Sequence, residues 1–367
     1  WSEWSENVTL TISNVPPVQN NPYLNSTSIN NYTSDNLTLW NQSTWDLDED
    51  NLKQIINWYI DGGSITVLNL PFEGGSNSTF AQDYSSYNNN VFTLGGDPTW
   101  NATSGHDGFG AYGFDGDDYL VVDDHASLDL SEQLTVEAWI YISGACNSYA
   151  RIVSKEQLDG NNIDDSFLLA LDDSCNDVSF TVYNSTREAI TTLSEGDILL
   201  QDTWYHVIGT YDNEVGAKLY VNGNLVDSDV GTGNIQISDV DLVIGAQANL
   251  INNQFNGVID DVRMYIGALS LGQVNLLYED GWSIHSSLTE ADENWQSEIT
   301  VNDGELDSES LMSNSIIINA LPNNAPYVTT VVMNSTDVNN YTNGSLQVSW
   351  DFNDDDGGSQ IDYETKW

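Results

Sequence analysis

The stretch Leu134-Thr-Val-Glu-Ala-Trp-Ile-Tyr-Ile142 alternates strictly in character. Its even-numbered residues are all aliphatic, and its odd-numbered residues are Thr135, Glu137, Trp139 and Tyr141. This period of two is typical of a β-strand with one face in a core. Five more short segments, rich in β-branched and aromatic residues and bounded by Asp, Asn and Gly, have the same character: 150–154, 167–171, 178–182, 204–211 and 242–245. The sequence therefore predicts antiparallel sheets in the middle of the chain.

Turn and cap signals indicate how these strands are connected. Asn222-Gly223 lies between two apolar runs, and both residues tolerate the positive φ angles of a type I′ turn, so we expect a tight hairpin. The segments 150–154 and 167–171 are expected to pair about Gly160-Asn161. Ser270 followed by Gln273 has the form of a capping box, which predicts a short helix at the end of the unit.

Several phrases of this region, taken together, resemble the laminin-G-like members of the concanavalin A-like lectin and glucanase superfamily. They are Phe114-Asp-Gly-Asp-Asp-Tyr119, Leu134-Thr-Val-Glu-Ala-Trp139, Trp204-Tyr-His-Val207, Lys218-Leu-Tyr-Val-Asn-Gly223 and Gly257-Val-Ile-Asp-Asp-Val-Arg-Met-Tyr265, followed by Ala268-Leu269. The resemblance covers residues 71–281. It implies a two-sheet jelly roll, commonly a carbohydrate-binding or protein-binding module of extracellular proteins, and by itself it implies no catalysis.

The segments on either side of this unit hold an internal repeat. Pro22-Tyr23, Asn25-Ser-Thr27, Asn31-Tyr-Thr33 and Trp45-Asp46 recur in the same order as Pro326-Tyr327, Asn334-Ser-Thr336, Asn340-Tyr-Thr342 and Trp350-Asp351. These β repeats resemble immunoglobulin-like or cadherin-like tandem domains of archaeal and bacterial surface proteins.

We therefore expect an all-β chain in which the laminin-G-like domain interrupts another sandwich. Residues 18–70 and 282–322 would be the two halves of one immunoglobulin-like domain, on either side of the insert at 71–281. Residues 1–17 would supply the closing strand of a preceding or neighbouring repeat, and residues 323–367 the first half of the next one.

The charge balance limits the partners of the chain. It carries 56 acidic and 7 basic residues, for a formal net charge of −49. Such a surface repels nucleic acids and anionic membranes, and salt or bound divalent cations relieve its self-repulsion. This indicates a high-salt or cation-rich exterior; the alternative is that surplus acidic residues only keep a large β-protein soluble. Without a signal peptide or a long apolar run, we expect a mature segment of a secreted or cell-surface protein, with no membrane insertion of its own.

Eleven Asn-x-Ser/Thr sequons are candidates for N-glycosylation. Ten of them lie outside residues 114–281, so we expect glycans on the flanks. The sequon residues are Asn7, Asn25, Asn31, Asn36, Asn41, Asn77, Asn101, Asn184, Asn334, Asn340 and Asn343.

The two cysteines, Cys146 and Cys175, are equidistant from the turn expected at Gly160-Asn161. They would emerge at the same end of that hairpin, so we predict a disulfide bond between them, worth roughly 3–4 kcal/mol in the chain-entropy model. A pair of buried free thiols is the alternative.

Calcium is the expected structural cofactor. The resemblance implies a site at Asp115 and Asp260, with Asp117 and Asp261 beside them, because relatives of this fold hold calcium between their terminal strands. In the alternative, Asp115, Asp117 and Asp118 cap a turn while Asp260 or Asp261 pairs with Arg263. The flanks have the alternate-residue oxygen spacing that hard cations favour, although a solvated turn explains it equally well: Asp46, Asp48 and Asp50, then Asp351, Asn353 and Asp355.

We expect no enzymatic activity. Glycosidases of this fold need two carboxylates across a cleft, and the Glu-x-Asp-x-x-Glu spacing of the laminarinase-like enzymes does not occur in the sequence. The four histidines are isolated from one another, and His206 fits a packing role within a strand.

Two functions of different classes remain, of which the first is our expectation and the second the alternative. In the first, the chain is a structural subunit of a cell-surface layer, sheath or filament, joined head to tail by strand complementation. Val8, Leu10 and Ile12 of one copy would enter a groove lined by Leu346, Val348 and Trp350 of the next, giving a homopolymer, unless both belong to one longer polypeptide. In the second, the laminin-G-like module binds glycans as an adhesin on a repeat-built stalk, with aromatic side chains stacked on sugar rings.

Overall fold

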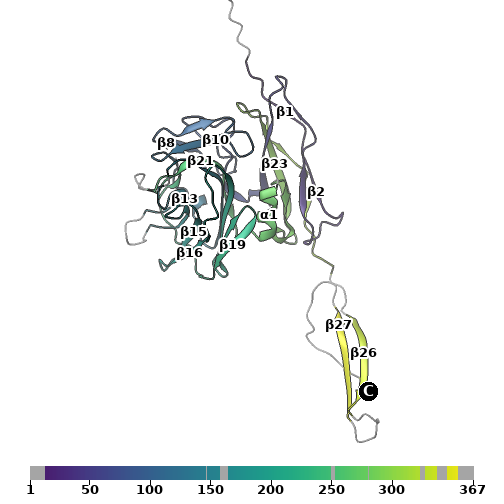
Figure 1. The fold of residues 1–367 in the computed structure, drawn as a ribbon. Helices are drawn as coiled ribbons and strands as arrows, with labels where there is room; N and C mark the ends of the chain where they lie inside the picture. The colour runs from purple at the N-terminus through teal and green to yellow at the C-terminus, as the bar shows by residue number, and fades with distance from the viewer. Residues whose placement is uncertain are drawn as a thin grey trace, which may run out of the picture.

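The computed structural model describes residues 13–145, 147–157, 164–248, 253–279, 281–322, 327–336 and 345–353. The described residues form an all-β structure with one α-helix, α1 (Leu271–Glu279), and two single 3-10 turns, Ala126–Leu128 and Ser286–Leu288. Figure 1 shows a jelly roll on one side, a second β-unit beside it with α1 in between, and a separate hairpin near the C-terminus. Within the described part of the chain, none of the helices has the length and apolarity needed to cross a membrane.

The jelly roll consists of two antiparallel sheets packed face to face, as predicted. The first sheet has the order β19 (Asn224–Asp229), β18 (Gly216–Val221), β17 (Trp204–Asp212), β12 (Gln133–Ile142), β21 (Asn256–Ile266), β10 (Ala111–Asp115) and β9 (Thr99–Asn101). The second has the order β16 (Ala189–Leu193), β15 (Val178–Tyr183), β14 (Phe167–Leu171), β13 (Arg151–Lys155), β20 (Leu242–Ile244), β11 (Tyr119–Val122) and β8 (Val91–Gly95).

The alternation along β12 explains how the sheets meet. Leu134, Val136 and Ala138 are fully buried in the core that the two sheets share. The opposite face of β12 is not left to solvent, because Thr135 and Glu137 are buried as well. Helix α1 and part of the second β-unit pack on this outer face, so the first sheet is covered on both sides.

The predicted hairpin at Asn222-Gly223, the pairing of 150–154 with 167–171 and the short helix are confirmed, whereas the turn expected at Gly160-Asn161 lies outside the described residues. Asn222 and Gly223 have φ angles of 48° and 76° and join β18 to β19 in a tight hairpin. Strands β13 and β14 pair in antiparallel register. The Ser270 hydroxyl accepts a hydrogen bond from the backbone N–H of Gln273 at 3.3 Å, which caps α1. The Gln273 side chain does not close a capping box; its amide instead donates to the Ser283 carbonyl, outside the helix.

The two flanks of the jelly roll form one β-unit, which we call the flanking unit. One of its sheets has the order β2 (Tyr23–Ser26), β3 (Leu37–Trp40) and β22 (Ser283–Ile284). The other has the order β24 (Leu311–Met312), β23 (Asn294–Asn302), β5 (Lys53–Ile60) and β6 (Gly63–Ser64), with β25 (Ile316–Ile317) also paired to β23. Strands β1 (Val18–Gln19) and β4 (Thr44–Trp45) make a short pair of their own.

Strands from before and after the jelly roll lie next to each other in the flanking unit. Strand β5 pairs with β23 along eight residues, from Lys53 opposite Asn302 to Ile60 opposite Trp295. Leu24, Leu37, Trp295 and Ile299 belong to one shared core. One boundary differs from our expectation: β7 (Thr66–Leu70) pairs with β21 and so belongs to the jelly roll, because its five residues are buried against that sheet.

A side-chain amide joins the flanking unit to the start of the jelly roll. Asn302 on β23 accepts a hydrogen bond from the N–H of Gly74 at 3.2 Å and donates to its carbonyl at 2.9 Å, as a neighbouring strand would. Tyr84 also donates to the Gly74 carbonyl and to Asp307. There is no room for a side chain at Gly74, where a Cβ would lie 2.6 Å from the backbone nitrogen of Glu305.

Near the C-terminus, β26 (Tyr327–Ser335) and β27 (Leu346–Asn353) form a two-stranded hairpin. Val348 and Trp350 are partly exposed on β27. The side chain of Leu346 and all of Val8, Leu10 and Ile12 lie outside the described residues, so the expected strand complementation stays a prediction.

We predict that Gly74→Ala destabilises the chain by about 1–3 kcal/mol, because a methyl group at this position forces the jelly roll and β23 apart. Thermal unfolding measures the effect. Gly63→Ala is the matched control, since a Cβ there meets only the Ile60 carbonyl oxygen at 3.6 Å. Equal melting temperatures for the two variants would contradict the close contact.

Candidate functional site

The outer face of the first sheet carries polar and charged side chains under the flanking unit. Strand alternation places Glu137 and Trp139 on this face of β12 and His206 opposite Trp139 on β17. A bulge in β21 between the partners of Glu137 and Trp139 brings Asp260 and Asp261 to the same region, and Asp261 has a φ of 49°. Such bulges often re-aim side chains.

Glu137 is the centre of a buried hydrogen-bond network. Its carboxylate is 1% exposed. It lies 2.8 Å from Nε2 of His206, and it accepts hydrogen bonds from Tyr265 at 2.7 Å and from Arg263 at 3.2 Å. Burial opposes ionisation, but the Arg263 guanidinium and the His206 hydrogen bond outweigh it, so the pKa of Glu137 lies below its ordinary value. His206 is therefore more than a packing residue.

Arg263 links this network to the two aspartates of the bulge. Its guanidinium forms an ion pair with Asp261 and donates from Nε to Asn69 at 3.1 Å. Asp260 accepts a hydrogen bond from the N–H of His106 at 3.0 Å and lies 2.9 Å from Nδ1 of the same residue. Burial and the neighbouring Asp261 raise the pKa of Asp260.

Lys53 brings a positive charge from the flanking unit into this acidic region. Its ammonium group forms an ion pair with Asp107 and lies 3.8 Å from Glu73 and 4.0 Å from Asp261. Glu73 is 1% exposed. Burial raises its pKa to about 8, although Lys53 partly opposes the shift.

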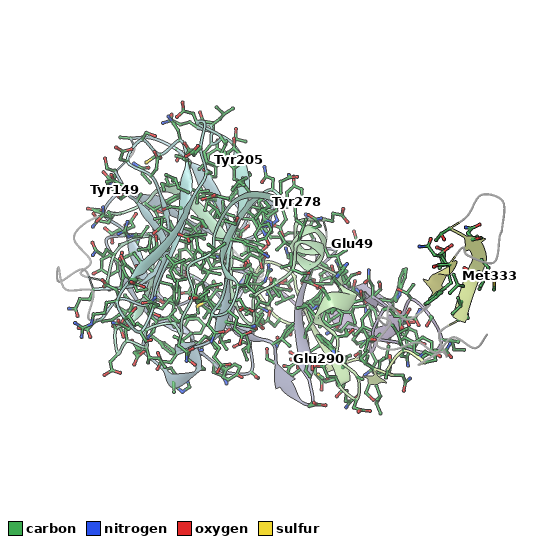
Figure 2. The ribbon with its side chains drawn as sticks, turned by 90° about the horizontal axis from the view of Figure 1, so that it is seen from below. Glu49, Tyr149, Tyr205, Tyr278, Glu290 and Met333 are labelled. Atoms are coloured by element: carbon green, nitrogen blue, oxygen red, sulfur yellow. The ribbon has the colours of Figure 1, made fainter. Side chains whose placement is uncertain are left out.

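Aromatic rings lie beside the charges. The His106 ring stacks on Trp139 with centroids 4.0 Å apart and planes 9° apart. The His206 ring, on β17, stacks on the Trp139 indole with centroids 4.9 Å apart. The Tyr278 ring of α1 lies 5.9 Å from the Trp139 ring and 5.9 Å from the His206 ring. Tyr278 is 40% exposed. Figure 2 shows it where the jelly roll meets the flanking unit, beside the helix.

Several of these groups line a cleft between the jelly roll and the flanking unit. Its cavity volume is about 260 Å³. The aromatic lining residues are Trp58, His106, Trp139, Tyr265, Tyr278 and Trp282, and the charged or amide ones are Lys53, Gln54, Asp107, Asp261, Arg263, Gln273 and Glu279. A cleft of this composition suits a small polar ligand that has an apolar face.

The structure separates two aspartates that we expected to share a calcium ion. Asp115 lies opposite Asn256 at one end of β21, whereas Asp260 is four residues further along that strand and contacts His106. The register therefore does not bring them together. The observed contacts match the alternative: Asp118 accepts hydrogen bonds from the N–H groups of Asp115 and Asp97, and Asp261 pairs with Arg263.

Among the residues that the structure describes, three groups of side chains have oxygen or nitrogen atoms close enough to share a cation: Asp115, Asp117 and Asp118; Asp46, Asp48 and Asp50; and His106, Asp260 and Asp261. In the last group, Lys53 and Arg263 are close to Asp261, which disfavours a cation there. Asp351 is exposed on β27, and the side chains of Asn353 and Asp355 lie outside the described residues.

The cysteine and sequon predictions have mixed outcomes. Cys175 is buried and disulfide-bonded, but its expected partner Cys146 lies outside the described residues, so their pairing stays a prediction. Asn184 is 3% exposed and hydrogen-bonded to Glu188 and Thr232, which leaves no space for a glycan. Asn25, Asn77, Asn101 and Asn334 are exposed, Asn31, Asn36 and Asn41 are partly exposed, and Asn7, Asn340 and Asn343 lie outside the described residues.

Several residues in and beside the cleft were not anticipated from the sequence. Lys53, Glu73, His106 and Asp107 come from the flanking unit and from loops, where no periodic pattern marks them. The available signal was on β12 and β21, where Glu137 and Arg263 each lie between two apolar residues of a strand. A charged residue in such a strand indicates a buried ion pair.

Comparison with known proteins supports the jelly roll. Residues 114–275 match the laminin-G family model described as the concanavalin A-like lectin/glucanases superfamily. This confirms the resemblance for that part of the chain. No curated protein sequence matches the chain.

Similar solved structures include receptor-binding domains of botulinum neurotoxins. The domain of the C/D mosaic serotype has a TM-score of 0.47 and 19% identity, over 59% of this chain and 51% of that one. The serotype D domain in complex with N-acetylneuraminic acid has a TM-score of 0.46 and 19% identity, over 59% and 50%. This chain therefore spans about half the length of these toxin domains.

A further similar structure is domain 4 of an extracellular arabinanase from Geobacillus stearothermophilus, in complex with arabinotriose. It has a TM-score of 0.45 and 17% identity, over 58% of this chain and 98% of that one.

We predict that the unaltered chain loses stability as the pH rises from acid to mildly alkaline, and that Glu73→Gln removes this loss. A carboxyl group whose pKa rises to about 8 on folding binds its proton more tightly in the folded state than in the unfolded state. Its contribution to the stability of the folded state is fully present below its ordinary pKa and is lost as the pH rises through 8. The loss is at most about 5 kcal/mol, since one pKa unit corresponds to about 1.4 kcal/mol. Denaturant unfolding between pH 4 and 9 measures it.

Glu290→Gln is the matched control, because Glu290 is exposed on the flanking unit. A pH profile that Glu73→Gln leaves unchanged would show that Glu73 is already ionised in the folded chain.

Proposed function

We propose that the chain is an extracellular, non-catalytic carbohydrate-binding protein, and that the cleft between the jelly roll and the flanking unit binds a short, neutral saccharide. The observation that carries the proposal is the lining of the cleft, where aromatic rings and paired charges converge. The match of residues 114–275 to the concanavalin A-like lectins and glucanases supports the same ligand class.

The chemistry of the lining suits a sugar ring. One face of a pyranose carries mainly C–H groups and packs on an aromatic ring, while its hydroxyl groups need hydrogen-bond donors and acceptors at the rim. Tyr278 offers a partly exposed ring, and Gln54, Asp107 and Lys53 offer polar atoms around it. The volume of about 260 Å³ is slightly below the range of about 300–1,000 Å³ that is usual for drug-sized ligands, so a short saccharide fits best.

The charges favour a neutral saccharide over an acidic one. Lys53 and Arg263 are the positively charged lining residues, and both already form ion pairs with carboxylates. Asp107, Asp261 and Glu279 line the same cleft. With a net charge of −49 on the whole chain, the approach of an anionic glycan is unfavourable.

The arrangement of carboxylates supports binding without catalysis. Glycoside hydrolysis needs two carboxyl groups that reach the scissile bond from opposite sides. Glu73 has the raised pKa of a general acid, yet it is buried and does not line the cleft. Glu137 is likewise buried and is not a lining residue, and the lining carboxylates of Asp107 and Asp261 form ion pairs with Lys53 and Arg263.

A structural role in a prokaryotic surface layer, sheath or filament is the second candidate, and exposed apolar residues on β26 favour it. Val328, Val331 and Met333 are 51%, 64% and 59% exposed. A two-stranded hairpin with an uncovered apolar face is marginally stable in water, so further strands of an immunoglobulin-like repeat would complete it. The proposed occupant is the strand with Val8, Leu10 and Ile12, from a neighbouring copy or from the same longer chain. Electron microscopy of the purified protein separates the candidates, because filaments without added saccharide would favour this one.

Structural calcium is a further part of the proposal, at the turn of Asp115, Asp117 and Asp118. The pKa of Asp117 is raised by a hydrogen bond to Asp115 and by the negative charge of Asp115. A bound cation would relieve the repulsion between the two carboxylates. Saturating calcium should raise the melting temperature, and Asp117→Asn should abolish most of that shift, whereas Asp48→Asn should not. A melting temperature that calcium and chelator leave unchanged would remove this site from consideration.

We predict that Tyr278→Ala weakens binding of a neutral saccharide about threefold to tenfold, which corresponds to the loss of one stacked ring. A glycan array identifies the ligand, and calorimetry then compares the variants. Tyr149→Ala is the control, because Tyr149 is 53% exposed on another part of the jelly roll (Figure 2). Equal affinity of the two variants, or binding only of acidic glycans, would contradict the proposed site.

A further inference from the structure

The sheet β2–β3–β22 presents two aromatic side chains to solvent. Tyr23 on β2 lies directly opposite Trp40 on β3. Their side chains are 50% and 56% exposed, whereas Leu24 and Leu39 on the other face of the same strands are buried in the core. Figure 1 shows β2 on the side of the flanking unit that faces away from the jelly roll. The pair is therefore separate from the cleft described above.

A sequon asparagine shares this face with the two rings. Alternation along β2 puts Tyr23 and Asn25 on the exposed side. Asn25 lies opposite Thr38, which makes Trp40 its diagonal neighbour across the strand pair. Diagonal neighbours on one face lie about 7–8 Å apart, within reach of an aromatic side chain. A sugar attached to Asn25 would therefore extend over Tyr23 and Trp40.

The sequons at Asn184, Asn36 and Asn101 lack this arrangement. Asn184 is buried, and the side-chain amide of Asn36 is a hydrogen-bond acceptor for the N–H of Ser286. Asn101 is exposed at the end of β9 but lies opposite Ala111, so no aromatic pair faces it across the strands.

A hollow adjoins Tyr23. Its lining includes Tyr23, Gln42 and Met312. Gln42 is exposed there, and an amide can hydrogen-bond to sugar hydroxyl groups. The face thus offers an apolar platform next to Asn25 and polar groups beyond Tyr23.

We propose that Asn25 carries an N-linked glycan whose first sugars pack on Tyr23 and Trp40, so that the glycan covers the exposed aromatic face of the flanking unit. The side-chain nitrogen of Asn25 forms a bond to the anomeric carbon of a lipid-phosphate-linked oligosaccharide supplied by a separate transferase. The bond from that carbon to the phosphate breaks, the lipid phosphate leaves, and the amide proton passes to a base of the transferase. The glycan is then an integral part of this surface, because it covers apolar rings that water would otherwise contact.

Mass spectrometry of the protein isolated from its own cells tests the attachment. The peptide with Asn25 is expected to carry a saccharide mass, and Thr27→Ala is expected to remove it. An unmodified Asn25 peptide overturns the proposal.

A double-mutant cycle tests the packing on the aromatic pair. Trp40→Ala should lower the melting temperature of the glycosylated protein more than that of the Asn25→Gln protein, because only the former loses a sugar–ring contact. It should also speed enzymatic release of the glycan from Asn25 severalfold. Tyr23→Ala serves as the second variant, should Trp40→Ala fail to fold.

Thr103→Ala, which removes the sequon at Asn101, is the matched control and should leave both measurements at Asn25 unchanged. If Trp40→Ala lowers the melting temperature equally with and without the glycan, and the release rate of the glycan is unchanged, the proposed packing is overturned.

Discussion

The buried carboxylate of Glu137 is the constraint on which the rest of the structure depends. An ionised group with 1% exposure is unstable unless partners replace the lost water, and Glu137 has three: His206, Arg263 and Tyr265. Because strand alternation places all four side chains on the outer face of the first sheet, that face cannot be a simple apolar layer. The flanking unit covers it and contributes its own charge, Lys53, to the adjoining carboxylates.

Hydrogen bonds between the jelly roll and the flanking unit hold the two in a fixed relative position. The chain crosses between them twice, and each crossing has a side-chain amide that bonds to backbone groups. Asn302 binds Gly74 near the entry, and Gln273 of α1 binds Ser283 and the N–H of His285 near the exit. The cleft therefore lies between walls that are held together by hydrogen bonds on both sides. A binding site with walls held in this way loses little conformational entropy when a ligand enters.

The sequence predicted what depends on local patterns. Alternation at residues 134–142 gave a correct strand, and Asn222-Gly223 gave a correct turn. It did not predict that Asp115 and Asp260 are separate, because their separation depends on the register between β10 and β21. Nor did it predict the contacts of Lys53 and His106, since both reach the site from other segments through tertiary packing. Asn184 has an ordinary sequon, and only the fold shows that its side chain is buried.

The placement of the basic residues determines what kind of surface the chain presents. The sequence has 7 lysines and arginines, and several of those that the structure describes are held inside by carboxylates. Lys155 is fully buried beside Asp124, Arg151 is 6% exposed beside Glu156, and Arg263 joins Glu137 to Asp261. Because these positive charges neutralise interior carboxylates, the surface is left with a large excess of negative charge. Such a surface repels anionic ligands at long range, so the proposed saccharide binding depends on short-range contacts such as ring stacking and hydrogen bonds to neutral hydroxyl groups.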